Sequence, residues 1–193
     1  MNNTEPTGDE SEPSTGVPPT IPASLDRFIR VGAAKPQPAT TAEPASSGAE
    51  PDNDNKIPRK TNVKDYSLQL AKAAAQVAIE NNGTEVMVLD VCDQTALFDY
   101  FVLATGTSRR QLHAISEQID DVLQKDMGDH RIGIEGYEDS RWIVLDYGSV
   151  VVHLFDEETR SYYDLESLWA DAKVVPLADL GLSDSGASSH SDN

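Results

Sequence analysis

Few side chains in this sequence have the types and spacing that catalysis requires. The 4 histidines and the single cysteine lie in no motif that pairs a nucleophile with a base or binds zinc. The nearest carboxylate pair is Asp164 and Glu166, which could hold a metal ion for phosphoryl transfer if both faced one way. We place that pair on a turn or a helix. The residues therefore predict no catalytic set, no metal site and no cofactor.

The turn between Thr105 and Ser108 offers the other route to chemistry. A glycine turn that leads into a helix can hold a phosphate group, because free backbone amides and the helix dipole point there, and Arg109 and Arg110 follow. The simpler interpretation is that Ser108 caps its own helix, with Gln111 three residues later as in a capping box. A single glycine is a weaker pattern than a P-loop. The alternative function is a nucleotide-binding or nucleotidyl-transfer enzyme that uses this turn, with the carboxylate pair as metal ligands.

Residues that suit protein recognition are more abundant than residues that could catalyse a reaction. Tryptophan, tyrosine and arginine dominate the hot spots of binding surfaces. In the C-terminal third they are mixed with carboxylates, as Trp142, Asp146, Tyr147, Arg160, Tyr162, Tyr163, Glu166 and Trp169. The competing interpretation is that the aromatic residues fill the core under a small sheet. The sequence therefore supports recognition of a partner better than catalysis.

The acidity of the chain limits the class of partner. Its 193 residues include 15 basic and 33 acidic side chains, which gives a formal net charge of −18. Such a chain repels phosphate backbones and acidic lipids. We therefore expect no direct DNA binding and no membrane association, and a basic protein is the partner that charge favours.

The sequence also predicts a compartment. One cysteine cannot form a disulfide within the chain, which indicates a reducing environment. The N-terminal residues lack the basic and apolar pattern of a signal peptide, and no apolar run approaches the length of a membrane span. We expect a cytoplasmic protein.

Composition divides the chain into a tail, a domain and a second tail. Residues 1–62 contain all but one of the 11 prolines, with many Ser, Thr and Glu, which predicts a disordered tail. One apolar island, Ser-Leu-Asp-Arg-Phe-Ile-Arg at residues 24–30, is either a docking motif or an incidental patch. Residues 63–177 are expected to form the domain and residues 178–193 a flexible polar tail.

Hydrophobic periodicity predicts the elements of this domain. We expect helices over 62–82, from Ser108 to Gly128 and after Asp156, and strands over 85–91, 100–104, 141–146 and 149–155. Residues 131–136 are a candidate for a further short strand, and residues 174–177 for a last extended piece. In the predicted hairpin, Trp142, Val144 and Asp146 share one face of the sheet, whereas Ile143 and Leu145 share the other. The order of elements predicts a single α/β domain in which helices cover a mixed sheet of roughly four or five strands.

Four motifs in this order resemble the ribosomal silencing factor family, also called Iojap-like proteins. They are Asp-Tyr-Phe-Val-Leu-Ala-Thr-Gly-Thr-Ser at 99–108, Glu-Gly at 135–136, Trp-Ile-Val-Leu-Asp-Tyr-Gly-Ser-Val-Val-Val-His at 142–153, and Arg-Ser-Tyr-Tyr-Asp-Leu-Glu-Ser-Leu-Trp at 160–169. The resemblance extends over residues 63–172 and does not include the N-terminal tail. It implies a fold similar to nucleotidyltransferases, without their catalytic acids.

The resemblance implies a protein that binds the large ribosomal subunit through ribosomal protein L-fourteen, blocks subunit joining and represses translation. It also implies no enzyme activity and a homodimer in the free state. The residues expected to bind the partner are Trp142, Asp146, His153, Arg160, Tyr163, Glu166 and Trp169. We expect alanine at Trp142 or Tyr163 to weaken binding by about 2 kcal/mol with the fold intact, unless both rings lie in the core. Residues 1–62 are expected to be dispensable for ribosome binding.

Overall fold

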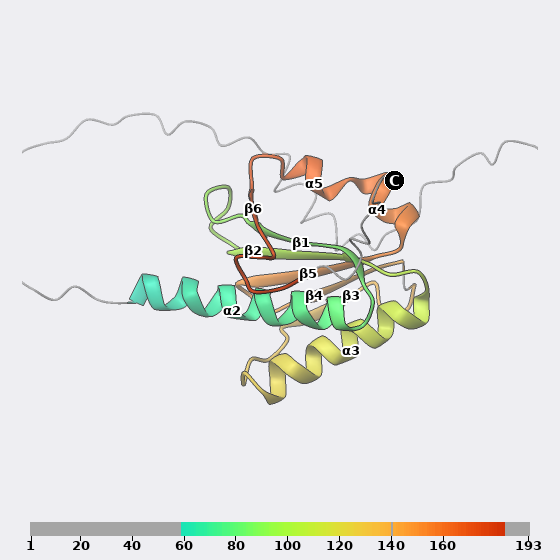
Figure 1. The fold of residues 1–193 in the computed structure, drawn as a ribbon, viewed down its shortest axis with the longest axis horizontal. Helices are drawn as coiled ribbons and strands as arrows, with labels where there is room; N and C mark the ends of the chain where they lie inside the picture. The colour runs from blue at the N-terminus through green and yellow to red at the C-terminus, as the bar shows by residue number, and fades with distance from the viewer. Residues whose placement is uncertain (1–58, 140, 184–193) are drawn as a thin grey trace, which may run out of the picture.

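Two parallel strands, β2 (Tyr100–Thr105) and β5 (Val150–Phe155), form the centre of the sheet and are buried at every position. A strand that is covered on both faces needs an almost continuous apolar sequence, which explains why residues 100–104 lack polar alternation. The computed structural model describes residues 59–139 and 141–183. Within them, every other strand joins the sheet by antiparallel pairing (Figure 1).

The outer strands complete a mixed sheet in the order β3-β4-β5-β2-β1-β6. They are β1 (Thr84–Asp90), β3 (Gly133–Glu135), β4 (Trp142–Asp146) and β6 (Lys173–Val175). The predicted α/β class and the predicted hairpin of β4 and β5 are confirmed. The described residues contain six strands, more than the four or five expected, because two three-residue strands pair at the edges. The likeness to nucleotidyltransferases stays a prediction.

Two long helices cover one face of this sheet, α2 (Arg59–Glu80) and α3 (Arg109–Lys125). Helix α2 begins at Arg59, three residues before the predicted start. Helix α3 begins as predicted, because the Ser108 side chain accepts a hydrogen bond from the backbone amide of Gln111 at 3.2 Å. In the described part of the chain, no helix has the length and apolar character to cross a membrane.

Two short helices lie over the opposite face, α4 (Glu157–Tyr163) and α5 (Leu165–Leu168). The sequence predicted a helix after Asp156, and apolar residues continue at near-helical spacing through residues 162–169. Asp164 interrupts this stretch, because its backbone adopts a left-handed conformation with φ 41°. The residue ends α4 and caps α5, whose Ser167 amide donates to the Asp164 carboxylate.

Side chains that alternate along the strands build two different cores. The face under α2 and α3, here called the aliphatic face, includes Ile143 and Leu145. The face under α4 and α5, here called the aromatic face, includes Phe101, Trp142 and Val144. The predicted division of the hairpin side chains between the two faces is therefore confirmed.

Residues 1–58 and 184–193, which contain most of the two predicted tails and the island at 24–30, lie outside the described residues. The ordered chain continues beyond the predicted domain end at residue 177. Leu180 is buried against the aliphatic core, so the start of the predicted C-terminal tail packs on the domain.

Candidate partner-binding site

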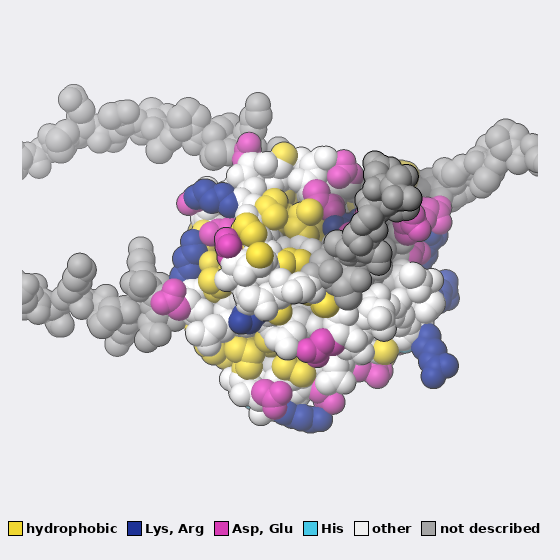
Figure 2. All heavy atoms as spheres, viewed as in Figure 1, with side chains coloured by type: hydrophobic (Ala, Val, Ile, Leu, Met, Phe, Trp, Pro, Cys, Tyr) yellow, Lys and Arg dark blue, Asp and Glu magenta, His cyan; other side chains and the backbone are white. Residues whose placement is uncertain are grey.

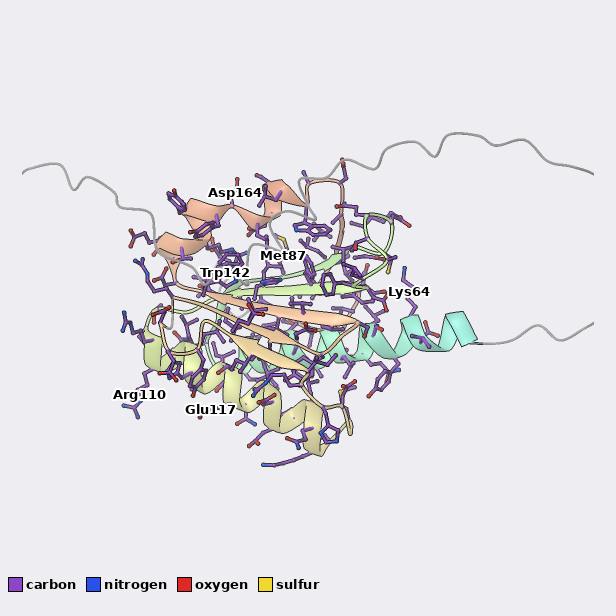
Figure 3. The ribbon with its side chains drawn as sticks, turned by 180° about the vertical axis from the view of Figure 1, so that it is seen from behind. Lys64, Met87, Arg110, Glu117, Trp142 and Asp164 are labelled. Carbon is purple, nitrogen blue, oxygen red and sulfur yellow. The ribbon has the colours of Figure 1, made fainter. Side chains whose placement is uncertain are left out.

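The structure brings the seven predicted partner-binding residues to one side of the sheet. Trp142, Asp146 and His153 project from β4 and β5 onto the aromatic face by strand alternation. The other four come from α4, α5 and the residue that ends α5: Arg160, Tyr163, Glu166 and Trp169. Figure 3 shows Trp142 on the same side of the sheet as Asp164, away from Arg110 and Glu117 of α3.

An aromatic cluster forms the centre of this site. The indole Nε1 of Trp142 donates a hydrogen bond to Nδ1 of His153 at 3.2 Å. The Trp142 ring also packs against Phe155, with 4.9 Å between centroids, and against Tyr163, with 5.3 Å. Phe101 packs edge-on against Trp169 at 4.9 Å and against His153 at 5.0 Å. Such tilted and edge-to-face pairs are the favoured aromatic geometries, so the cluster is a well-packed unit.

The burial of this cluster corrects one prediction. Trp142 is 2% exposed, Trp169 is 1% exposed and His153 is 0% exposed. A side chain this deep in the fold stabilises it and does not meet a partner directly. The expectation that the Trp142 ring faces the partner while leaving the fold intact is therefore wrong. The ring was placed at the surface because strand alternation gives the face of a residue but not what covers that face.

The cluster reaches solvent through two adjacent tyrosines of α4. Tyr163 is half-buried against Trp142, whereas Tyr162 is 56% exposed. The two rings pack edge to face with centroids 4.9 Å apart. Tyr162 was absent from the predicted set, although two adjacent tyrosines leave room for one exposed ring, which was a usable signal. The accessible part of the site is therefore the α4 tyrosine pair.

Arg160 is buried and connects α4 to the end of the sheet. Its guanidinium donates to the Glu166 carboxylate through Nε at 2.7 Å and forms an ion pair with it through Nη2 at 2.6 Å. It also donates to the Glu85 backbone carbonyl and to Thr105 Oγ1, both at 2.8 Å. Arginine presents several donors in a rigid fork, which suits this arrangement. Arg160 and Glu166 therefore position α4 and its tyrosines.

Asp146 also has a positioning role in the hairpin. The residue is 8% exposed, and its Oδ1 accepts a hydrogen bond from the Gly148 amide at 2.8 Å. Gly148 has φ 81°, a conformation that favours glycine. The carboxylate thus stabilises the turn between β4 and β5.

The alternative phosphate site finds little support in the geometry of the 105–108 turn. The side chain of Gln111 accepts a hydrogen bond from the Thr107 amide at 2.8 Å, so this amide is already occupied. A surface hollow of about 850 Å³ adjoins Gly106, but its lining includes four carboxylates: Glu85, Asp156, Glu157 and Glu158. Phosphate groups are repelled by such a lining. The turn therefore serves as a helix cap.

The two candidate metal ligands, Asp164 and Glu166, already have structural partners within the fold. Asp164 caps α5, and Glu166 pairs with Arg160. In the residues that the structure describes, no group of three His, Cys, Asp or Glu side chains is placed to hold a metal ion. The expectation that this pair sits on a turn or helix is confirmed.

Cys92, the single cysteine, is a partly buried free thiol. Its Sγ lies 3.5 Å from the Asp99 carbonyl. Burial, followed by the nearby Asp90 carboxylate, raises the pKa of the thiol to about 11. Because the thiolate is the reactive form, this cysteine is a poor nucleophile at neutral pH.

The surface is acidic with scattered hydrophobic groups. Residues 63–177 carry 9 basic and 21 acidic side chains, a net charge of 9 − 21 = −12. In Figure 2, hydrophobic side chains gather near β6, with acidic side chains around them. Leu97 and Val174 are among the exposed large hydrophobic residues of the described chain. Such a surface favours contact with a basic protein over contact with a nucleic acid.

The family model and the similar proteins both indicate the same family. The family model described as "Ribosomal silencing factor during starvation" matches residues 64–193. The ribosomal silencing factor RsfS of Bacillus subtilis is 38% identical over 111 residues, which are 58% of this chain and 91% of that protein. The mouse protein named "Mitochondrial assembly of ribosomal large subunit protein 1" is 37% identical over 92 residues, which are 47% of this chain and 40% of that protein.

A crystal structure gives the same result for the fold. A protein from Chromobacterium violaceum superposes with a TM-score of 0.51 and 31% sequence identity. The superposition covers 62% of this chain and 95% of that chain.

Proposed function

The chain belongs to the ribosomal silencing factor family, and from this membership we propose that it is a ribosome-associated silencing factor. The family match over residues 64–193 is the observation that carries the proposal. It spans the sheet, both pairs of helices and the α4 tyrosine pair. The proposed action is regulation of translation by binding, without an enzymatic step.

The finer proposal concerns the partner. We propose that the domain binds the large ribosomal subunit through ribosomal protein L-fourteen and thereby blocks joining of the small subunit. Support comes from the net charge of −12 in residues 63–177, since an acidic surface accelerates encounter with a basic protein. The same charge disfavours the surrounding ribosomal RNA, so the domain must approach a protein patch in a defined orientation.

The proposed contact surface is the solvent end of the aromatic face. Tyr162 supplies an exposed ring, and Tyr163 supports it from the buried cluster. Glu157 and Glu158 in the first turn of α4 place negative charge beside these rings. An aromatic anchor with a charged rim is the usual anatomy of a binding hot spot.

Sedimentation with isolated ribosomal subunits tests the proposal. We expect the full chain to co-sediment with large subunits and not with small ones, and to bind purified ribosomal protein L-fourteen. Binding to neither subunit, or equal binding to both, would overturn the proposal. Large-subunit binding without binding to that ribosomal protein would keep the role and change the partner.

Calorimetry with nucleoside triphosphates and magnesium tests the enzyme alternative. We expect no binding, because the hollow beside Gly106 is lined by acidic residues and the Thr107 amide is occupied. Binding tighter than about 100 μM, or roughly −5.5 kcal/mol, would restore the nucleotide hypothesis.

The expected homodimer and the cytoplasmic localisation remain proposals. Light scattering of the free chain and of its complex with the ribosomal partner tests the first. A dimer that opens on binding would indicate that both contacts use one surface, whereas a dimer that persists in the complex would require two surfaces. Microscopy of the tagged full-length protein tests the second.

A further inference from the structure

A hollow of about 540 Å³ opens between α3 and the connection from β3 to β4. Its volume is within the range of small-ligand sites. Glu117 of α3 lines it, and Figure 3 shows this residue on the opposite side of the sheet from Trp142 and Asp164. The hollow is therefore separate from the α4 tyrosine pair, and the proposed function does not use it.

The wall of this hollow is an aromatic ring that is held from two directions. Tyr137 stacks on His113 of α3, with 4.1 Å between ring centroids and 8° between ring planes. The Tyr137 hydroxyl donates a hydrogen bond to the Glu117 carboxylate at 2.7 Å, and His113 Nε2 lies 2.9 Å from the Tyr137 carbonyl oxygen. Of the two rings, Tyr137 lines the hollow, so His113 supports it from behind. A ring fixed in this way is a preformed surface for a ligand.

Gly136 keeps the space beside this ring open. Its φ is 69°, and a Cβ atom there would lie 1.9 Å from the Trp142 carbonyl oxygen, so glycine is the residue that fits. The close approach to β4 leaves the next residue, Tyr137, in contact with α3. Because Gly136 lines the hollow without a side chain, the Glu-Gly motif at 135–136 shapes the hollow as well as the turn.

The rim of the hollow favours positive charge. Glu117, Glu138 and Asp139 line it, and all three residues are exposed. Carboxylates a few ångströms away attract a cation and repel an anion. Ile134 adds an apolar contact next to the Tyr137 ring. The matching ligand is therefore a cation with a planar or apolar body.

Arg131 shows which cation suits this place. Its side chain lines the hollow, and its guanidinium pairs with the Asp120 carboxylate. The other oxygen of Asp120 accepts a hydrogen bond from the Tyr147 hydroxyl at 2.7 Å, so the charge of Asp120 is already offset. A guanidinium is planar, stacks on aromatic rings and donates two parallel hydrogen bonds to a carboxylate. An ammonium group has no plane to stack.

We propose that this hollow binds a guanidinium group from outside the chain, which stacks on the Tyr137 ring and pairs with Glu117 and Asp139 at the rim. The source is either an arginine side chain of a basic protein or a free small molecule that carries a guanidinium. The aromatic wall distinguishes this hollow from the acidic hollow beside Gly106, whose lining contains no aromatic residue. The site adds a second recognition surface to the domain and does not rest on the proposed function.

NMR titration of the full chain with a capped Gly-Arg-Gly peptide locates the site. We expect saturable shifts of the Glu117 and Tyr137 backbone amides with a Kd of about 1 mM or tighter, and no saturable shift at Thr107 or Glu158 beside the acidic hollow. A capped Gly-Lys-Gly peptide of equal charge should bind more weakly, because its ammonium cannot stack. Equal binding of both peptides, or equal shifts at both hollows, would overturn the proposal, since charge alone would then explain the contact.

Substitutions test the ring and the rim separately. Tyr137→Leu should weaken binding of the arginine peptide by about fivefold or more, whereas Tyr137→Phe keeps the ring and should retain most of the affinity. The pair Glu117→Gln with Asp139→Asn should also weaken binding, with an acceptor kept for the Tyr137 hydroxyl. The matched control, Glu80→Gln with Asp171→Asn, removes the same charge from exposed positions outside the hollow and should leave binding unchanged.

Unchanged binding in a folded Tyr137→Leu protein, or equal losses in the rim pair and its control, would overturn the proposal. Thermal melting shows whether each variant remains folded. If Tyr137→Leu does not fold, the rim pair and its control decide the question, because they leave the aromatic wall in place.

Titration with free arginine separates the two sources of the guanidinium. We expect the capped peptide to bind more tightly, because the carboxylate of the free amino acid meets the acidic rim, and this result assigns the site to a protein side chain. Free arginine that binds at least as tightly would uphold the site and assign it to a small molecule, whereas binding of neither would overturn it. These titrations contain no ribosomal subunits, so they decide the site whatever the sedimentation experiment shows.

Discussion

The two faces of the central sheet use different side chains for the same task of burial. The aliphatic face is filled mainly by Val, Leu, Ile and Ala from the strands and from two long helices, with two buried tyrosines, Tyr100 and Tyr147. The aromatic face contains both tryptophans and the buried His153, together with polar groups at its margin. A methyl-rich core needs only the correct volume, whereas tryptophan, histidine and arginine also need hydrogen-bond partners. The aromatic face is thus the more demanding of the two to assemble and the better suited to recognition.

The largest expected effect compares adjacent residues of β4 that face opposite ways. We expect Trp142→Ala to lower stability by about 3–5 kcal/mol, because it removes a large buried ring and leaves a cavity. Ile143→Ala on the aliphatic face should cost about 2–5 kcal/mol. Chemical denaturation measures both values.

The two variants differ in what else they change. Trp142→Ala should also alter the packing of Tyr163 and therefore weaken partner binding at temperatures where the variant is folded, whereas Ile143→Ala should not. A Trp142→Ala protein that melts like the parent would place this ring at the surface and remove the distinction between the faces.

The second prediction tests the buried arginine of the aromatic face against an exposed one. Arg160→Met should cost about 3 kcal/mol, because it leaves the Glu166 carboxylate and the Glu85 carbonyl without their buried donor. Arg141→Met should cost about 1 kcal/mol or less, since Arg141 pairs with Asp156 and Glu158 near the surface. Thermal melts of both variants provide the measurement.

Equal destabilisation by the two arginine variants would contradict the role assigned to Arg160. The double variant Arg160→Met with Glu166→Gln gives a further check. It should recover part of the loss, because no unpaired charge then remains in the site.

The third prediction concerns binding and the α4 tyrosine pair. Tyr163→Ala should weaken large-subunit binding by about 2 kcal/mol, since it removes the ring that connects the surface to the cluster. Tyr66→Ala is the matched control, because that residue is 40% exposed and belongs to α2, which covers the opposite face of the sheet from α4. Titration of each variant against purified subunits checks the result.

A stronger effect of Tyr66→Ala than of Tyr163→Ala would move the binding surface to the α2 side. In that case the aromatic face would be a structural core only. Tyr162→Ala distinguishes the contact from its support, since its exposed ring should affect binding with little change in melting temperature.

The smallest expected effect lies on the aliphatic side. Ser108→Ala should cost about 1 kcal/mol of stability, because the Gln111 amide at the start of α3 loses its acceptor. Ser108→Asp retains an acceptor at the same place and should be close to neutral. Chemical denaturation resolves a difference of this size, and a loss of subunit binding in a folded Ser108→Ala protein would argue for a functional role of the turn.

Local patterns in the sequence determined a large part of this fold. The apolar run at residues 100–104 predicted the central strand, and the Ser108–Gln111 spacing predicted the start of α3. The two-residue period of β4 correctly separated Trp142 from Ile143. These features depend on neighbours within a few positions along the chain, which a single sequence displays directly.

Tertiary structure alone decided how deep each side chain lies and which groups it meets. Arg160 donates to Thr105 and to the Glu85 carbonyl, 55 and 75 positions away, and no local pattern encodes such pairs. Trp142 and Tyr162 are both aromatic residues in the same third of the chain, yet one is buried in the core and the other is more than half exposed. The difference follows from the position of α4 over the sheet, which depends on the left-handed turn at Asp164 and on the Arg160 contacts. Burial is a property of the assembled layers, so the sequence could name the candidates for recognition but not the surface that they form.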